Sequence, residues 1–388
     1  MTFLWLCRQP PYPPLRGGDV EYSRELIHSL ARHTPTQGLA FAEDGVEPPA
    51  DAPLPWVTVP YKKKSKIASL ASPLPDVAFR FQQQRYLDRA IEMARDADAI
   101  FVDFIGMAWL VKPLHDALKA GRGHAPIIMV THNHEYAMRR EHARASPFPM
   151  RLALTLDAEK AGRLERGANR TADGISAITP EDAAVLTRDC KTPVEVILPG
   201  YDGPRRPTRR IDAATPRVAC ILGGRRSTHK VAVLEHSLAA LARHGADRAV
   251  TVEIGGDGDL DHIARQYPNI VFKGFVEDLV SYSNGIRLGL IPDDIGGGFK
   301  IRVLSHVFLR MPILGLHSAM AGTGLRSGEH FVGVDTLDEL AERLPTLMDD
   351  VETLDAMQNA AYAYCEARYD WADRGATLAA FAQKLMDR

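Results

Sequence analysis

Short runs of apolar residues alternate along this chain with longer segments in which apolar residues recur every three or four positions. Short runs bounded by turn residues are typical of buried strands, and the longer spacing is typical of amphipathic helices. Their alternation predicts an α/β fold, in which helices cover a parallel sheet. The predicted strands are residues 2–6, 99–103, 126–131, 217–222, 249–254, 270–273, 288–291 and 312–316, and helices include 20–31, 79–95 and 231–244.

A segment rich in proline, glycine and arginine separates the two groups of strands. It ends at residue 216, and its helix and strand breakers leave no room for an undisturbed element. The 388 residues of the chain suffice for two domains. We therefore predict an N-terminal domain at residues 1–200, a linker at 201–216 and a second domain from 217. Ligands of open parallel sheets bind beyond the carboxyl ends of the strands, so motifs at those ends carry most weight.

Composition and charge exclude several classes of protein. With 45% hydrophobic and 25% charged residues, the chain is neither disordered nor fibrous. Its 47 basic and 49 acidic residues give a net charge of −2, which argues against a nucleic-acid partner. Its 4 cysteines form no C-x-x-C pair, which favours a reducing cytosol over a zinc or disulfide scaffold. No signal peptide or membrane-spanning run is evident, so membrane contact is expected to be peripheral.

Two motifs follow predicted strands of the first domain. Gly17 and Gly18 stand at the start of a predicted helix. Without side chains they let a ligand approach the backbone, and the free N–H groups of the helix start favour an anion. A turn with no binding role is the alternative. His132 follows the strand at 126–131, where an imidazole can donate to an oxygen or move a proton. The alternatives are a helix-capping histidine, or a metal site that includes His134. Because the spacing H-E-x-x-H is missing, we expect no metal.

A basic, glycine-containing loop follows the first strand of the second domain. Gly223 and Gly224 permit close backbone approach, Arg225 and Arg226 offer planar forks for phosphate oxygens, and Lys230 adds a point charge. These residues predict a diphosphate site. The loop matches neither G-x-x-x-x-G-K-S/T nor G-x-G-x-x-G, which argues against a P-loop ATPase and a standard dinucleotide site. A solvated basic turn is the alternative.

A second glycine run precedes an amphipathic helix of the same domain. Gly297 and Gly298 offer N–H donors at the helix start, and Lys300 follows in its first turn. We expect this run to complete an anion cradle with the basic loop. The glycines at 255–258 are interpreted as a strand-ending turn.

Residues 61–95 carry an excess of positive charge. Eight basic residues stand against three acidic ones, and apolar residues are interleaved with them. Such a segment suits an anionic membrane surface, where each basic residue contributes about 1 kcal/mol, while a solvated loop and helix is the alternative. The basic residues at its start are Lys62, Lys63, Lys64 and Lys66.

Seven motifs, in order and over nearly the whole chain, resemble those of the bacterial glycosyltransferases of family 4, which are retaining enzymes of the GT-B fold. Residues 13–18 resemble the family's P-x-x-G-G loop, and 130–132 the strand that ends in the histidine beside the transferred sugar. The other five are residues 172–179, 197–202, Gly224–Arg225 with Lys230, 271–276 and 310–314.

This resemblance implies an architecture. Two Rossmann-like parallel-sheet domains would face a central cleft, with residues 1–200 binding the acceptor and 217–370 binding the nucleotide-sugar donor. A C-terminal helix at 371–388 would return to the N-terminal domain.

The resemblance also implies an activity. The enzyme would move a hexose from a UDP or GDP sugar to a saccharide or lipid-linked acceptor in bacterial polysaccharide or glycolipid assembly. The nucleotide sugar is a substrate, and no metal or other cofactor is expected. Such an enzyme would be cytoplasmic, with attachment to the inner face of the plasma membrane as an open alternative.

Roles for single residues follow from the same resemblance. His132 would contact the sugar, and Arg225 or Arg226 with Lys230 would neutralise the leaving diphosphate. The backbone of Gly297 and Gly298 would assist, beside Lys300, while Gly17 and Gly18 would let the donor phosphate and acceptor meet.

In one respect the chain departs from the family, which commonly has two glutamates where Gly297 and Ser305 stand. Serine can still hydrogen-bond a ribose hydroxyl, and glycine-rich variants of this loop occur in such transferases. The departure leaves a catalytically silent binding module as an alternative, and a nucleotide-sugar epimerase of the same fold is another.

Overall fold

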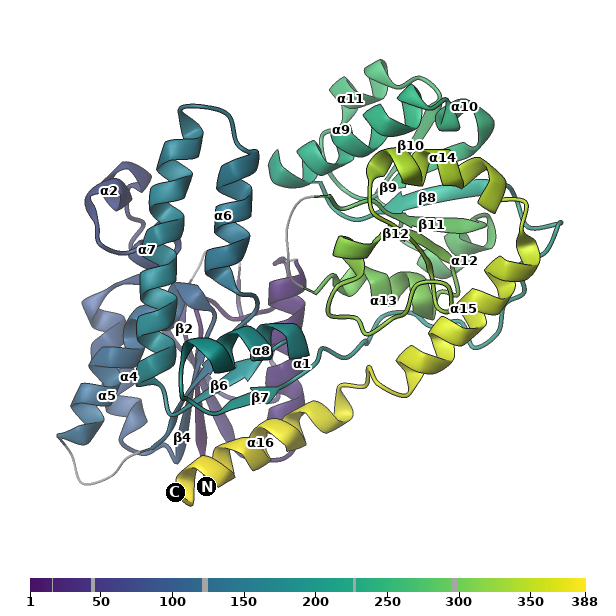
Figure 1. The fold of residues 1–388 in the computed structure, drawn as a ribbon. Coiled ribbons are helices and arrows are strands. Elements are labelled where there is room, and N and C mark those ends of the chain that lie inside the picture. The colour runs from purple at the N-terminus through teal and green to yellow at the C-terminus, as the bar shows by residue number, and fades with distance from the viewer. Residues whose placement is uncertain (16, 43–45, 121–124, 226–227, 295–298) are drawn as a thin grey trace. The chain divides into compact units, whose positions relative to one another are not determined.

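The computed structural model describes the chain except for residues 16, 43–45, 121–124, 226–227 and 295–298. The chain forms two compact units, each built on a parallel sheet (Figure 1). Unit 1 comprises Met1–Gly200 and Asp370–Arg388, and unit 2 comprises Tyr201–Tyr369. Residues 201–216, the predicted linker, therefore group with unit 2. Among the described residues, no helix combines the length and the apolar character needed to cross a bilayer.

Unit 1 contains a seven-stranded parallel sheet with the order β3-β2-β1-β4-β5-β6-β7. Its strands are β1 Phe3–Leu6, β2 Thr36–Ala42, β3 Trp56–Pro60, β4 Ala99–Asp103, β5 Ile127–Val130, β6 Gly174–Ala177 and β7 Val194–Val196. Its helices are α1 Gly18–Ala31, α2 Lys66–Ala71, α3 Asp76–Phe81, α4 Gln84–Ala94, η1 Ile105–Leu110, α5 Val111–Lys119, α6 Glu135–Ala145, α7 Met150–Thr171, α8 Pro180–Asp189 and α16 Ala372–Met386.

Unit 2 contains a six-stranded parallel sheet with the order β10-β9-β8-β11-β12-β13. Its strands are β8 Val218–Leu222, β9 Thr251–Gly255, β10 Ile270–Gly274, β11 Leu288–Ile291, β12 Ile313–Leu316 and β13 Val332–Val334. Its helices are α9 Thr228–Arg243, α10 Ala246–Ala249, α11 Asp261–Gln266, α12 Leu279–Asn284, α13 Ile301–Phe308, η2 His317–Met320, α14 Leu337–Leu347 and α15 Val351–Glu366.

Both sheets reverse their strand order beside their first strand. In unit 1 the reversal lies between β1 and β4, and in unit 2 between β8 and β11. At such a point the connections leave in opposite directions, which opens a crevice at the carboxyl ends of the strands. The predicted motifs at the ends of β1, β8 and β11 therefore lie beside these two crevices.

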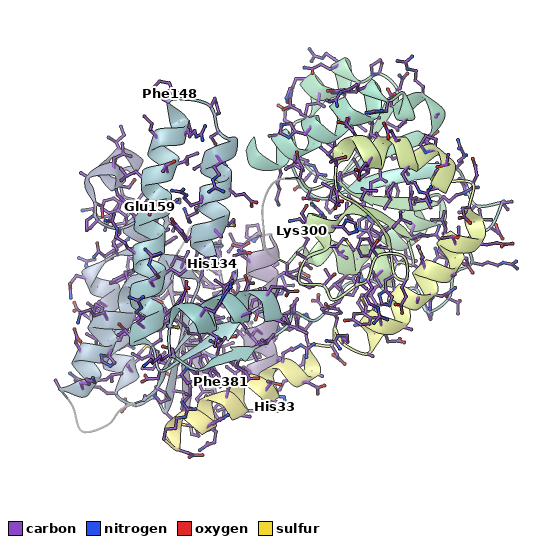
Figure 2. All side chains as sticks on the ribbon, viewed as in Figure 1. His33, His134, Phe148, Glu159, Lys300 and Phe381 are labelled. Carbon is purple, nitrogen blue, oxygen red and sulfur yellow. The ribbon has the colours of Figure 1, made fainter. Side chains whose placement is uncertain are left out.

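Helix α16 returns to unit 1 and packs against α1. Close backbone contact makes this possible, since a Cβ on Gly375 would lie 2.2 Å from the carbonyl of Ser29. The Ser29 hydroxyl accepts the Gly375 N–H at 2.8 Å and donates to Trp371 O at 2.5 Å. Phe381 lies on the side of α16 that faces β6 (Figure 2), 2.9 Å from where a Cβ on Gly174 would be. The predicted α/β fold with two Rossmann-like sheets and a returning C-terminal helix is confirmed.

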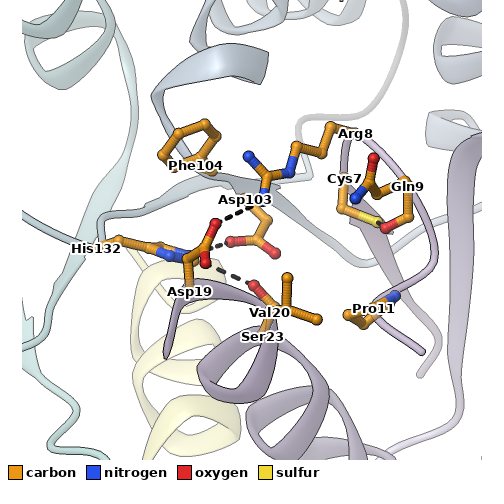
Figure 3. Close-up of a pocket in the computed structure, with 10 residues that line it drawn as sticks. All are labelled: Cys7, Arg8, Gln9, Pro11, Asp19, Val20, Ser23, Asp103, Phe104 and His132. Carbon is orange, nitrogen blue, oxygen red and sulfur yellow. Dashed lines mark hydrogen bonds and ion pairs between the residues drawn. The ribbon is translucent and has the colours of Figure 1, made fainter. Parts of the chain in front are cut away.

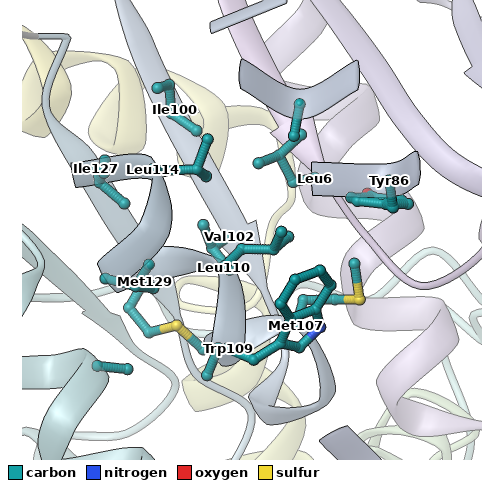
Figure 4. Close-up of a cluster of buried hydrophobic side chains, with 14 of the residues drawn as sticks. Leu6, Tyr86, Ile100, Val102, Met107, Trp109, Leu110, Leu114, Ile127 and Met129 are labelled. Atoms are coloured by element: carbon teal, nitrogen blue, oxygen red, sulfur yellow. The ribbon is translucent and has the colours of Figure 1, made fainter. Parts of the chain in front are cut away.

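The core of unit 1 lies between the sheet and the helices that cover it (Figure 4). Leu6, Val102 and Met129 project from three neighbouring strands and are almost fully buried. They pack with Leu110 and Leu114 of the segment that follows β4. Helices bury the sheet, so its central strands are continuous apolar runs, which is why they could be found in the sequence.

The helix predicted at 79–95 is wrong in one respect, because the structure divides this region into α3 and α4. Gln82 and Gln83 between them have extended backbone. The Gln83 amide exchanges hydrogen bonds with the backbone of Lys62, at 3.2 Å to the N–H and 3.0 Å to the carbonyl. This bond with another segment holds Gln83 in the extended conformation.

Candidate functional site

A small pocket lies at the carboxyl ends of β1 and β4 (Figure 3). The start of α1 forms one wall, and the residues that follow β4 and β5 form the others. Charged side chains from each of these elements meet there, namely Arg8, Asp19, Asp103 and His132.

His132 and Asp103 form a buried pair. His132 Nε2 lies 2.7 Å from Asp103 Oδ1, and both residues are less than 10% exposed. Asp103 is held on its other side by Trp5, whose indole N–H donates to Oδ2 at 3.2 Å. Burial opposes the imidazolium, but the Asp103 and Asp19 carboxylates raise the pKa of His132 above its ordinary value. His132 Nδ1 is buried and has no hydrogen-bond partner among the described residues.

Arg8 and Asp19 form a second pair in this pocket. Arg8 Nη2 lies 2.5 Å from Asp19 Oδ2, and its guanidinium stands 4.8 Å from the centre of the Phe104 ring. Burial disfavours the charge on Asp19, yet Arg8 and His132 lower the pKa of this carboxyl below its ordinary value. Phe104 has a positive φ of 73°, which is rare for an aromatic residue and places its ring 5.5 Å from that of His132.

Gly17 and Gly18 lie at the start of α1, as predicted from the sequence. Gly17 has φ 145°, and a Cβ there would lie 2.7 Å from Asp19 Oδ1. Only glycine therefore lets the Asp19 carboxylate lie beside this backbone. An acidic side chain of the chain itself already occupies this helix start, and the role of both glycines toward a donor stays a prediction.

His134 has a different partner from His132. Its Nε2 lies 3.8 Å from Glu165 Oε2. Glu165 also accepts the first backbone N–H groups of α6, from Glu135 at 2.8 Å and Tyr136 at 3.1 Å, so this α7 residue caps α6. Within the described part of the chain, no three His, Cys, Asp or Glu side chains gather closely enough to hold a metal ion.

In unit 2, the loops after β8 and β9 lie against each other. Gly223 N donates to Gly255 O at 2.9 Å, and Arg225 N donates to Asp257 O at 2.6 Å. A Cβ on Gly256, whose φ is 138°, would lie 2.0 Å from Gly223 O. The glycine-rich turn after β9 thus supports the backbone of the predicted diphosphate loop.

Two guanidinium groups converge on this loop. A Cβ on Gly223 would lie 2.9 Å from Arg225 Nη1 and 3.2 Å from Arg302 Nη1. Arg225 Nη1 donates to Gly223 O at 2.5 Å, while its buried Nε has no partner in the described ranges. Arg302 pairs with Asp293, the residue two beyond β11. Burial and then the Arg302 charge lower the pKa of Arg225 to about 10. This environment favours the arrival of negative charge.

The remaining predicted residues of unit 2 lie on α9 and α13. Lys230 is exposed in the first turn of α9, Lys300 is the residue before α13, and Ser305 is half-buried within α13. Arg226, Gly297 and Gly298 lie outside the described residues.

The basic segment lies on unit 1, around α2. Lys62 and Lys63 are exposed, and Lys66 begins α2. Lys64 donates to Gln82 O and stands 4.6 Å from the centre of the Phe79 ring.

Comparison with known proteins shows the fold family of the chain. No protein-family model and no curated protein matches the sequence. Among solved structures, sucrose-phosphate synthase from Thermosynechococcus elongatus is similar, with a TM-score of 0.72 and 12% identity over 100% of this chain and 99% of that one. HepE from Anabaena in complex with UDP has a TM-score of 0.64 and 15% identity over 99% and 100%. The lipopolysaccharide glycosyltransferase WaaG has a TM-score of 0.64 and 14% identity over 98% and 99%. These structures are GT-B glycosyltransferases, and the chain has the GT-B fold.

Proposed function

We propose that this chain is a retaining glycosyltransferase that moves a hexose from a UDP or GDP sugar to a saccharide or lipid-linked acceptor. The observation that carries the proposal is the convergence of two guanidinium groups, from Arg225 and Arg302, at the carboxyl ends of β8 and β11. Arg302 is paired with Asp293, and Asp257 lies beside Gly224, while the buried Nε of Arg225 has no partner in the described ranges. A diphosphate would accept hydrogen bonds from both guanidinium groups. Similar solved structures of HepE in complex with UDP and with UDP-glucose support this choice of donor.

The proposed reaction breaks the bond between the anomeric carbon and the donor diphosphate and forms a bond from that carbon to the acceptor oxygen. Negative charge develops on the departing diphosphate, where fixed guanidinium groups and backbone N–H groups stabilise it without reorganisation. The acceptor proton would pass to a donor phosphate oxygen. In this proposal no metal ion is needed, so turnover should be unchanged by EDTA.

His132 would contact the transferred sugar. Asp103 favours its charged form, and its Nδ1 is buried with no partner among the described residues. A charged imidazole N–H without an acceptor is prepared to donate to a ligand oxygen. His132→Ala should therefore retain nucleotide-sugar binding and lose turnover, and unaltered turnover would remove His132 from the catalytic residues.

Calorimetry with UDP and GDP sugars tests the donor site. Replacement of Arg225, Arg226 and Lys230 by Ala should abolish binding, and unchanged affinity would end the proposal. Arg225 is buried, so circular dichroism must show that the variant is folded. Arg326→Ala, which removes an exposed arginine paired with Glu329, is the matched control and should bind normally.

We further propose that the enzyme acts in polysaccharide or glycolipid assembly in the cytoplasm and attaches to the inner face of the membrane through residues 61–95. Lys62 and Lys63 are exposed and would meet anionic lipid. Sedimentation with anionic vesicles should pellet the wild-type protein, and absence from the pellet would defeat this part of the proposal.

A catalytically silent binding module remains the second candidate, because Gly297 and Ser305 stand where glutamates are common. Thermal-shift measurements with UDP, GDP and their sugars separate the two. A shift with one of these nucleotides supports the transferase, and no shift with any of them favours the silent module.

A further inference from the structure

The helical hairpin formed by α6 and α7 ends in exposed apolar side chains. Phe148, between the two helices, is 79% exposed, and Leu152 on α7 is 63% exposed. Six of the nine exposed large apolar side chains among the described residues fall in two short segments of unit 1. These six, which we call the apolar tip, are Ile67, Leu70, Phe148, Met150, Leu152 and Leu156.

The two segments of the apolar tip belong to neighbouring helices. Lys160 of α7 donates to the carbonyl oxygens of Ser69 at 3.0 Å and Leu70 at 2.9 Å, which fastens α2 to α7 (Figure 1). Leu152 and Leu156 precede Lys160 by two turns and one turn, so they continue the face of α7 that holds α2. Phe148 lies at the end of the hairpin (Figure 2). The six side chains thus border one surface.

Charged and polar side chains link the two helices of the hairpin. Polar contacts join α6 to α7: Arg139 meets Asp157 at 2.9 Å, and Arg140 meets Glu159 at 2.7 Å. Tyr136 also donates to Glu159 at 3.1 Å. Apolar residues that are clustered and exposed indicate a surface that is covered by a partner.

The charge around the apolar tip selects the kind of partner. Residues 61–75 and 138–156 contain eight basic residues and one acidic residue, Glu141. Two of the eight, Arg139 and Arg140, are paired with Asp157 and Glu159, and the other six leave this surface positive. A second copy of this chain would bring the same positive surface and be repelled. Anionic phospholipid offers both an apolar layer and negative phosphates, which the exposed Lys62, Lys63, Arg144 and Arg151 would meet.

We propose that the apolar tip inserts into the interface of an anionic membrane while the surrounding cations bind its phosphates. This inference extends the membrane contact of the proposed function. It identifies the α6–α7 hairpin as the inserting element, and it does not depend on transferase activity.

Vesicle flotation with the full chain tests the inference. Vesicles of phosphatidylcholine with about 30 mol% phosphatidylglycerol should bind the wild-type protein, and pure phosphatidylcholine should bind it at least about tenfold less. The triple variant Phe148→Ser, Leu152→Ser and Leu156→Ser should bind the anionic vesicles at least about tenfold less than the wild type. Val271→Ser, which removes an apolar side chain that is 38% exposed in unit 2, is the control and should bind like the wild type.

Three results would overturn the inference. They are unchanged flotation of the triple variant, equal binding to neutral and anionic vesicles, or a wild-type dimer in sedimentation velocity that the triple variant abolishes. Phe148→Trp gives a second reading, since its emission should shift to the blue with anionic vesicles, and an unshifted spectrum contradicts insertion. Nucleotide-sugar calorimetry distinguishes the two proposals. If the triple variant binds the donor normally but no longer floats with vesicles, membrane insertion of the apolar tip is supported. If the wild-type protein does not bind a nucleotide sugar, only the proposed donor site is contradicted.

Discussion

The two crevices of this protein differ in how their charges are matched. In unit 1, His132 and Arg8 each have a carboxylate partner, Asp103 and Asp19 respectively. In unit 2, Arg225 and Arg302 converge on Gly223, and Arg225 donates to backbone carbonyls instead of a carboxylate. In the first cluster His132 and Arg8 are each matched by a carboxylate, whereas in the second Arg225 lies beside Arg302 and its buried Nε has no partner among the described residues.

From this difference we predict that the crevice of unit 2 is the one that binds an anion. Buried charges are stable when each is paired, so the described residues of the unit 1 cluster leave only Nδ1 of His132 without a partner in this pocket. Crowded guanidinium groups repel each other, and a diphosphate would relieve that repulsion. Removal of a charge should therefore harm stability most in unit 1 and binding most in unit 2.

The largest expected effect is on the stability of unit 1. Asp103→Asn removes the carboxylate that balances buried His132, and loss of one partner from a buried pair should lower the free energy of unfolding by about 3 kcal/mol. Urea unfolding at pH 6 measures it. Asp116→Asn breaks an exposed pair with Lys112 and should change stability little. Equal effects of the two variants would mean that the His132–Asp103 pair is not buried as described.

The next effect concerns ligand-dependent stability of unit 2. UDP at a hundred times its Kd should stabilise the wild-type protein by about 2.7 kcal/mol, read from the thermal midpoint. Arg302→Gln removes one of the two guanidinium groups beside Gly223, so the Kd of this variant for UDP should rise at least about tenfold. Arg326→Gln is the exposed control. If Arg302→Gln binds UDP as the wild type does, the Arg302 guanidinium does not contribute to nucleotide binding.

A smaller effect is expected on the pH dependence of stability. Since Asp103 raises the folded-state pKa of His132, the pair stabilises fully below the unfolded pKa of about 6.5, and this stability is lost as pH rises through the folded pKa. Urea unfolding free energies should fall across that interval by up to about 1.4 kcal/mol per pH unit. His132→Gln should flatten this slope, and an unchanged slope would assign the titration to another group.

The smallest effect tests a single hydroxyl in unit 2. Ser305→Ala should weaken binding of the nucleotide by about 1 kcal/mol, or roughly fivefold, if its hydroxyl bonds the ribose. Thermal stability without ligand should change little, because the substitution removes a single hydroxyl from a side chain that is only half-buried on α13. Comparison of UDP with 2′,3′-dideoxy-UDP identifies the ribose as the contact. A weakening that is the same for both nucleotides would contradict it.

Much of the fold could be predicted because buried parallel strands are apolar on both faces. The predicted strands at 99–103 and 288–291 have the bounds of β4 and β11. The strands predicted from the sequence omit β2, β3, β6, β7 and β13. Glycine or proline interrupts the apolar pattern of β2, β3, β6 and β13, and β7 is a three-residue strand with a glutamate at its centre. Their positions depend on pairing with neighbouring strands, which no local pattern reveals.

The partners within each candidate site could be predicted less well. His132 was found because it follows an apolar strand, but its partners Asp103 and Asp19 come from distant segments of the chain. A signal for Asp103 was present, since a carboxylate ends the apolar run of β4. Arg302 was missed because its approach to Gly223 is set by the packing of α13.

The return of α16 to unit 1 has a consequence for biosynthesis. Residues 372–386 emerge from the ribosome only after all of unit 2 has been translated, about ten to thirty seconds after Gly200 at roughly 5–20 residues per second. Until then the nascent chain exposes the backbone of Ser29 and the surface of β6 that α16 later covers. The first unit to be synthesised is therefore the last to be completed.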